Sequence, residues 1–322
     1  MAPLAVRPAR YAQRVTTPVA RARPPRPAAL NRALFAWFDA HRRDLAFRRT
    51  RDPYAVLVAE VMLQQTQAAR VEPAWEAFMA RFPTVATLAE ASTADVIRAW
   101  AGLGYYGRAV RLHRAARAIV ERHGGVVPAE IGTLQRLPGV GGYTARAVAA
   151  TAFGTRVAAL DTNVVRVVGR VFGVGAAGSH APRHEVQGLA DGWVPADRAA
   201  DWTHATMDLG AIVCRAHDPD CPACPLRRLC TSVDAVPRVA REGDAPPAGR
   251  TPAPRFEASR RWLRGRIVAR LTREPDGAWV EIAGSIGSHA AESVESALVD
   301  LAADGVLNRD TTGAVRLARN AA

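Results

Sequence analysis

Residues 137–145 of this 322-residue chain are LPGVGGYTA, a glycine-rich turn between two segments with helical periodicity. Gly139, Gly141 and Gly142 free the backbone to make a tight turn that exposes its N–H groups. A helix that begins after such a turn presents unpaired donors and the positive end of its dipole, which together attract phosphate. The stretch therefore predicts a phosphate-binding hairpin between two helices.

The helical pattern extends in both directions from this turn, from residue 30 to about residue 229. Apolar residues recur there at intervals of three and four, Gly or Pro marks the breaks, and the alternation typical of strands is scarce. We therefore expect a mainly α domain over 30–233. Its predicted helices are 30–41, 54–68, 73–81, 93–101, 107–122, 130–136, 143–153, 162–173, 182–192 and 196–211.

The regions outside this domain differ from it in composition. Residues 1–29 hold six arginines, six prolines and no acidic residue, which predicts a disordered basic arm, with a mitochondrial transit peptide as the alternative. Residues 234–256 hold five prolines and predict an exposed linker. Residues 257–322 predict a small α+β domain that resembles a winged helix. Its expected elements are helices over 257–272 and 290–304 and two short strands around 310–313.

The charge of the chain favours a polyanionic partner. The formal net charge is +13, and all 43 basic residues are arginine because the sequence contains no lysine. Such an excess indicates nucleic acid first and an anionic membrane surface second. No apolar run is long enough to cross a bilayer and no secretory signal is evident, so we expect a cytoplasmic protein, with no membrane partner.

All four cysteines lie within a segment of seventeen residues, with the spacing C-x6-C-x2-C-x5-C. This clustering predicts a metal site, since disulfides are disfavoured in the cytosol. Structural zinc usually takes two C-x2-C pairs, whereas one short pair flanked by single cysteines is typical of iron–sulfur clusters. We predict an iron–sulfur cluster, with zinc as the alternative. The four ligands would be Cys214, Cys221, Cys224 and Cys230.

Two carboxylates occupy contrasting environments. Glu60 lies in the apolar helical run 56–63, where burial raises the pKa of a carboxyl group. Asp161 stands where a helix N-cap is expected, and this position keeps a carboxylate ionised. Such a pair suits cleavage of a glycosidic bond, which needs an acid for the leaving group and an anion beside the oxocarbenium-like centre. Capping alone is the simpler interpretation of Asp161.

The cysteine spacing and the hairpin are similar to those of the endonuclease III superfamily of DNA glycosylases. The resemblance implies a two-lobed helix-hairpin-helix fold and a structural 4Fe-4S cluster. Within that superfamily, residues 60–67 (EVMLQQTQ) and 102–106 (GLGYY) resemble the MutY family of A/G-specific adenine glycosylases. The resemblance spans residues 30–233. It implies a bacterial, nucleoid-associated monomer that removes adenine mispaired with 8-oxoguanine or guanine in double-stranded DNA.

The resemblance also assigns roles to individual residues. Glu60 becomes the acid and Asp161 the cation stabiliser, supported by Tyr143 and Asn163. Contacts to DNA or to its bases are implied for Gln64, Gln65, Thr66, Tyr105, Arg48, Gly139, Gly141 and Gly142. The cluster loop would contact DNA phosphates through the arginines that it carries, which are Arg215, Arg227 and Arg228. The simpler alternatives are solvated arginines, core positions for Tyr105 and Tyr106, and a solvated Gln64.

Several features depart from the family pattern or discriminate within it. Phe47 replaces an expected tryptophan, and His204, at a position where an amide or carboxylate is usual, is expected on a helix surface. Tyr143 stands where the endonuclease III branch has lysine, which implies a monofunctional enzyme. The tail is too short for the nucleotide-hydrolase-like domain common in full-length relatives. The alternatives are an endonuclease III-like glycosylase for oxidised pyrimidines and a non-catalytic DNA-binding module.

Overall fold

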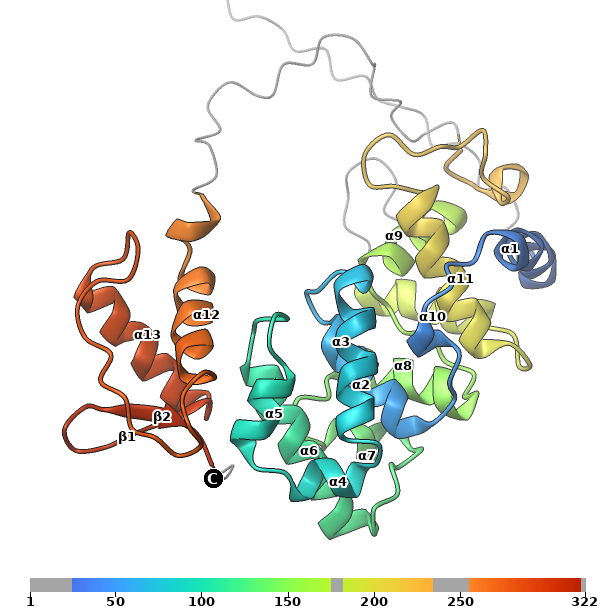
Figure 1. The fold of residues 1–322 in the computed structure, drawn as a ribbon. Helices are drawn as coiled ribbons and strands as arrows, with labels where there is room; N and C mark the ends of the chain where they lie inside the picture. Colours follow the sequence, from blue (N-terminus) through green and yellow to red (C-terminus); the bar gives the residue numbers. More distant parts are fainter. Residues whose placement is uncertain (1–24, 175–181, 234–254, 320–322) are drawn as a thin grey trace, which may run out of the picture.

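The computed structural model describes residues 25–174, 182–233 and 255–319, and these form a mainly helical protein with a small C-terminal unit (Figure 1). The predicted fold class is confirmed, whereas most of the expected arm and linker lies outside the described residues. The elements up to the cysteine loop are α1 (Pro27–His41), η1 (Ala46–Arg48), α2 (Pro53–Leu63), α3 (Ala68–Arg81), α4 (Val85–Glu90), α5 (Thr93–Ala99), α6 (Gly107–His123), α7 (Ile131–Gln135), α8 (Gly142–Phe153), α9 (Thr162–Phe172), α10 (Arg183–Trp193) and α11 (Ala199–Ile212).

Two hydrophobic cores divide these helices into two lobes. The first core collects buried side chains of α2 to α8, among them Phe78 and Trp100, which meet edge to face. The second core joins α1, α9, α10 and α11 to the cysteine loop, around a similar contact between Trp193 and Trp202. The two-lobed architecture is therefore the predicted one. No helix in the described ranges is long and apolar enough to cross a membrane.

Helix α2 is the central helix of the first lobe. Asp52 caps its N-terminus by accepting from the backbone N–H groups of Tyr54 and Ala55, and Pro53 occupies its first position. Every residue from 54 to 62 is buried, so the helix has no solvated face. Any polar side chain on it must consequently face another part of the protein or a cavity.

The predicted helix over 54–68 is wrong at its end, because α2 stops at Leu63 and α3 begins at Ala68 rather than at 73. Gln65 has a φ of +55°, a left-handed conformation that breaks the helix. The carbonyls of Val61 and Met62 at this end accept hydrogen bonds from the guanidinium group of Arg108 in α6. The six-residue helix α4, which a Thr84–Thr87 capping box begins, was not among the predicted helices.

The C-terminal unit consists of α12 (Arg260–Leu271), α13 (Ala291–Ala303) and the antiparallel strands β1 (Leu307–Arg309) and β2 (Val315–Leu317), preceded by the short η4 (Phe256–Ala258). Two helices followed by strands on either side of 310–313 is the predicted order. Its apolar residues join the core of the first lobe. The Thr93 N–H donates to the Arg319 carbonyl at 3.1 Å, and Arg98 pairs with Asp276 at 3.3 Å, so the unit packs beside α5 (Figure 1).

Candidate active site

A cavity of about 520 Å³ lies between the two lobes, with walls from α2, α8, α9 and α11. It brings together eight of the twelve residues expected to be catalytic or to contact DNA bases. These are Arg48, Glu60, Gln64, Gln65, Thr66, Tyr143, Asp161 and Asn163. Among the residues expected to be catalytic or to contact DNA bases, those that do not line it are Tyr105, Gly139, Gly141 and Gly142.

Glu60 is the acidic group of the buried helix, with an exposed fraction of only 8%. Burial raises the pKa of its carboxyl group to about 7, while a hydrogen bond with Tyr143 and the charge of Arg48 act in the opposite direction. Its Oε2 atom has no hydrogen-bond partner among the described residues. Glu60 is therefore an acid that holds its proton near neutral pH and has a free oxygen for a ligand.

Asp161 is the predicted N-cap of α9. Its carboxylate accepts from the Val164 N–H at 2.7 Å and from the Asn163 side-chain amide at 3.0 Å. Asn163 is itself held by the Arg166 guanidinium, which donates to its Oδ1 atom at 2.7 Å. Gly210 of α11 permits this arrangement, because a Cβ atom there would lie only 2.6 Å from the Asn163 Cβ. The carboxylate is thus fixed at the cavity wall by capping and by a neighbouring amide.

Arg48 is oriented by a carboxylate that the sequence analysis did not single out. Asp208 of α11 is completely buried and accepts two hydrogen bonds from Arg48, at 2.8 and 3.0 Å, and further ones from Arg43. Burial alone would raise the Asp208 pKa, but the two guanidinium groups hold it below its ordinary value. The planar fork of Arg48 is therefore locked in position at the cavity, beside Phe47.

The expectation for His204 is wrong. Its side chain is buried and lines the cavity instead of lying on a helix surface. Burial, followed by the positive charges of Arg48 and Arg51, lowers the His204 pKa to about 3. The imidazole is consequently neutral at physiological pH and contributes a polar, uncharged wall.

Arg108 of α6 connects the end of α2 to the loop that precedes α6. It is 4% exposed, and burial, followed by the charge of Arg261, lowers its pKa to about 10. No pattern in the sequence had marked Arg108 as a structural or functional residue. Its guanidinium group donates to the carbonyls of Val61, Met62, Gln64, Leu103 and Gly104 and to the Thr66 hydroxyl.

The Gln64 side chain and Tyr105 lie on the two segments that Arg108 joins. Gln64 donates to the Thr144 hydroxyl at 3.2 Å, so it is not a solvated helix residue. Tyr105 is 42% exposed with a φ of +49°, whereas Tyr106 is buried in the core. The alternative of a core position thus holds for Tyr106 and is wrong for Tyr105.

The glycine hairpin has the predicted geometry. Gly139 has a φ of +78°, and Gly141 is the N-cap of α8 without a side chain to satisfy the first N–H groups. Gly141 and Gly142 are both exposed. A Cβ atom at Gly139 would lie 2.8 Å from the Arg111 Cβ, so the hairpin packs directly on α6. Phosphate binding at this turn remains a prediction.

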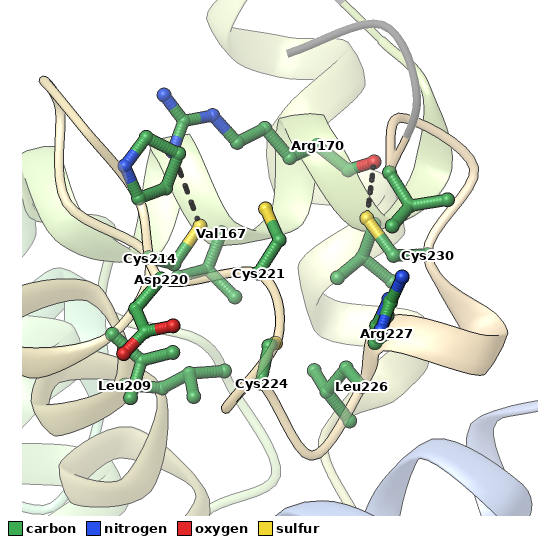
Figure 2. Close-up of a pocket in the computed structure, with 14 residues that line it drawn as sticks. Val167, Arg170, Leu209, Cys214, Asp220, Cys221, Cys224, Leu226, Arg227 and Cys230 are labelled. Atoms are coloured by element: carbon green, nitrogen blue, oxygen red, sulfur yellow. Dashed lines mark hydrogen bonds between the residues drawn. The ribbon is translucent and has the colours of Figure 1, made fainter. Parts of the chain in front are cut away.

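The four cysteines line one cavity in the loop after α11 (Figure 2). The Arg170 guanidinium donates from Nη1 to the Cys214 Sγ at 3.3 Å, and the Cys230 thiol donates to the Arg170 carbonyl at 3.4 Å. Burial raises the pKa of the Cys224 thiol to about 11 and raises that of Cys230. As the side chains stand in the described ranges, no group of three or more ligands is arranged around a metal ion. The donor set nevertheless fits a thiolate-bound centre, since all four cysteines line one small cavity.

Known proteins that are similar to this chain identify its family. The family model described as "HhH-GPD superfamily base excision DNA repair protein" matches residues 58–193. A solved structure titled as a thermostable thymine-DNA glycosylase aligns with a TM-score of 0.61 at 30% identity, over 64% of this chain and 96% of that one. The chain belongs to the HhH-GPD superfamily.

Among HhH-GPD proteins, adenine DNA glycosylases are similar to this chain in sequence. The human protein is 44% identical over 65% of this chain and 40% of its own length. The protein of Mycobacterium tuberculosis (strain CDC 1551 / Oshkosh) is 49% identical over 60% of this chain and 64% of its own length. The resemblance to the MutY family is thereby confirmed, although the chain matches less than two thirds of either relative.

Proposed function

We propose that this HhH-GPD protein is a monofunctional adenine DNA glycosylase that acts on adenine mispaired with 8-oxoguanine or guanine in double-stranded DNA. The observation that carries the proposal is Glu60, a buried acid with a pKa of about 7 and an unpartnered oxygen in the cavity between the lobes. The similarity of the chain to proteins named adenine DNA glycosylase supports adenine as the excised base.

The proposed reaction breaks the bond between adenine and its sugar. Adenine departs poorly as an anion, so Glu60 donates its proton to a ring nitrogen as the C–N bond lengthens. Asp161 places a negative charge beside the sugar as it becomes an oxocarbenium-like cation, and the Asn163 amide holds that carboxylate. Water then adds to the sugar carbon and loses a proton, which leaves an abasic site.

The cavity walls suit a base that has left the duplex. An enzyme that acts on a base must take it out of the stack and surround it with stacking and hydrogen-bonding groups. Phe47 offers an aromatic ring, Arg48 a fixed guanidinium group and His204 a neutral imidazole. Phe47 keeps the stacking surface where the family has tryptophan.

The product of the reaction provides the first test. We expect the purified chain to release adenine from a duplex with adenine opposite 8-oxoguanine and to leave the abasic strand uncut until alkali is added. The reason is that the chain has no lysine for a Schiff base, and Tyr143 occupies the relevant position. Gel electrophoresis with and without alkali measures both steps. Release of oxidised pyrimidines instead, or strand cleavage without alkali, contradicts the proposal.

We propose a 4Fe-4S cluster as the structural cofactor, held by Cys214, Cys221, Cys224 and Cys230. The cluster stabilises the loop and supplies none of the bond-breaking chemistry. Arg227 and Arg228 are exposed on this loop, where they would contact DNA phosphates. As partner and location we propose double-stranded DNA in the bacterial cytoplasm, with the protein acting as a monomer.

The metal content tests the cofactor separately from the activity. We expect a brown protein with about four irons and about four sulfides per chain, because thiolates with this spacing favour an iron–sulfur cluster over zinc. Elemental analysis and visible absorption measure this, and Cys221→Ser is expected to lose iron while Ser232→Ala, on the same loop, keeps it. A colourless preparation with one zinc per chain contradicts the prediction.

A further inference from the structure

A second cavity, of about 300 Å³, lies between α12 of the C-terminal unit and the start of α6. It shares no lining residue with the cavity around Glu60. Tyr105 forms part of its wall, and four arginines but a single acidic residue supply its charged groups. These are Arg111, Arg260, Arg261, Arg264 and Asp304.

The four arginines differ in how their charges are balanced. Arg260 pairs with Asp300 of α13, and Arg264 pairs with Asp300 and Asp304. Arg111 and Arg261 have no carboxylate within ion-pair distance in the part of the chain that the structure describes. Two uncompensated guanidinium groups from different domains therefore face one cavity, an arrangement that suits an anion.

Arg261 is the point at which the C-terminal unit contacts the Tyr105 loop. Its guanidinium carbon lies 4.4 Å from the centre of the Tyr105 ring, on a side chain that is 42% exposed. A Cβ atom at Gly104 would lie 3.6 Å from two Arg261 nitrogens, so the guanidinium group rests against the loop backbone. The α12 helix thus contributes a charged group to a surface formed mainly by the glycosylase domain.

We propose that this cavity binds a backbone phosphate of the DNA strand opposite the excised adenine, through Arg111 and Arg261. The choice of strand rests on the proposed function. A base held at Glu60 belongs to one strand, and Gln64, which the resemblance assigns to its former partner in the other strand, lines the same cavity. Arg108 donates both to the Gln64 carbonyl and to the Gly104 carbonyl in the loop of Tyr105. The cavity lined by the four arginines, called the arginine cavity below, therefore lies beside the strand opposite the excised adenine.

Arg111 also explains how this site would join the rest of the DNA-binding surface. Its Cβ atom packs against Gly139 of the hairpin, while its guanidinium group lines the arginine cavity. The hairpin, a predicted phosphate site, and the arginine cavity are therefore adjacent. A phosphodiester chain is an anion that can span such a surface, whereas a small carboxylate would occupy one part of it.

Salt-dependent binding tests the proposal without relying on turnover. We would measure the affinity of the full chain for a fluorescent duplex with an uncleavable 2′-fluoro-adenosine opposite 8-oxoguanine, and for an undamaged duplex, over a range of salt. The variant is Arg261→Gln, and Arg266→Gln is its control, because Arg266 is an exposed arginine of the same helix outside the cavity. Thermal unfolding checks that both variants fold.

We expect Arg261→Gln to weaken binding about fivefold and to reduce the slope of log affinity against log salt by about one. Arg111→Gln should give a similar loss, and the double variant little more, since both groups hold one phosphate. An unchanged slope in Arg261→Gln, or an equal loss in Arg266→Gln, overturns the proposal. Adenine release by the unmodified chain tests the proposed function separately, so the phosphate site stands or falls independently of catalysis.

Discussion

Replacing Glu60 by glutamine is expected to lower the rate of adenine release by about a thousandfold or more, because the amide cannot supply the proton that the departing base requires. The substitution keeps the size of a side chain whose residue is only 8% exposed, so the fold should persist. Single-turnover kinetics with a duplex containing adenine opposite 8-oxoguanine measure the loss. Binding of the same duplex is expected to change little.

Glu76→Gln provides the matched control, since Glu76 is an exposed glutamate of α3. It should keep both the rate and the affinity. Full activity in Glu60→Gln would show that Glu60 is not the acid. The alternative of a non-catalytic DNA-binding module is tested separately, by whether the unmodified chain releases adenine. An equal loss in the control would instead indicate a general effect of charge.

The same substitution has a pH signature in stability. The folded pKa of about 7 lies above the ordinary value of 4.5, so folding favours the protonated form. The stability that this proton contributes is complete below the unfolded pKa and is lost as pH rises through the folded one. Glu60→Gln removes this dependence, so its stability relative to the unmodified chain should improve by about 3 kcal/mol between about pH 4 and about pH 8. Denaturant unfolding at the two pH values measures the difference.

Local patterns were sufficient to predict the structural environments of the two carboxylates. The apolar run around Glu60 indicated a buried acid, and the break before residues 162–166 indicated that Asp161 caps a helix. Both properties depend on a few neighbouring residues, which the sequence displays. The grouping of the four cysteines at one cavity followed in the same way from their spacing.

The residues that the sequence analysis missed act over long distances in the chain. Asp208 orients Arg48 across 160 residues, and no local pattern distinguishes it from a surface aspartate. His204 is buried because α11 packs against the other helices on nearly all sides, which periodicity within α11 does not reveal. Helix α2 ends early for a related reason, since Arg108 reaches its last carbonyls from α6. The contact of Arg261 with Tyr105 likewise joins segments on either side of the predicted linker.

Arg108→Met is expected to destabilise the folded protein by about 3 to 5 kcal/mol, because buried carbonyls at the end of α2 and in the Tyr105 loop lose their donor. Methionine replaces much of the buried apolar stem, so lost packing contributes little. The loss should also slow adenine release, since the segments of Gln64 and Tyr105 are no longer joined. Denaturant unfolding and single-turnover kinetics measure the two effects.

Arg122→Met is the control for this prediction, as Arg122 is exposed in the last turn of the same helix and should tolerate the change within about 0.5 kcal/mol. If Arg108→Met does not fold, Arg108→Lys separates charge from geometry. An ammonium group keeps the charge but lacks the planar fork that reaches two segments at once, so most of the loss should remain. Near-normal stability in Arg108→Lys would show that the charge alone holds α2 and the loop together.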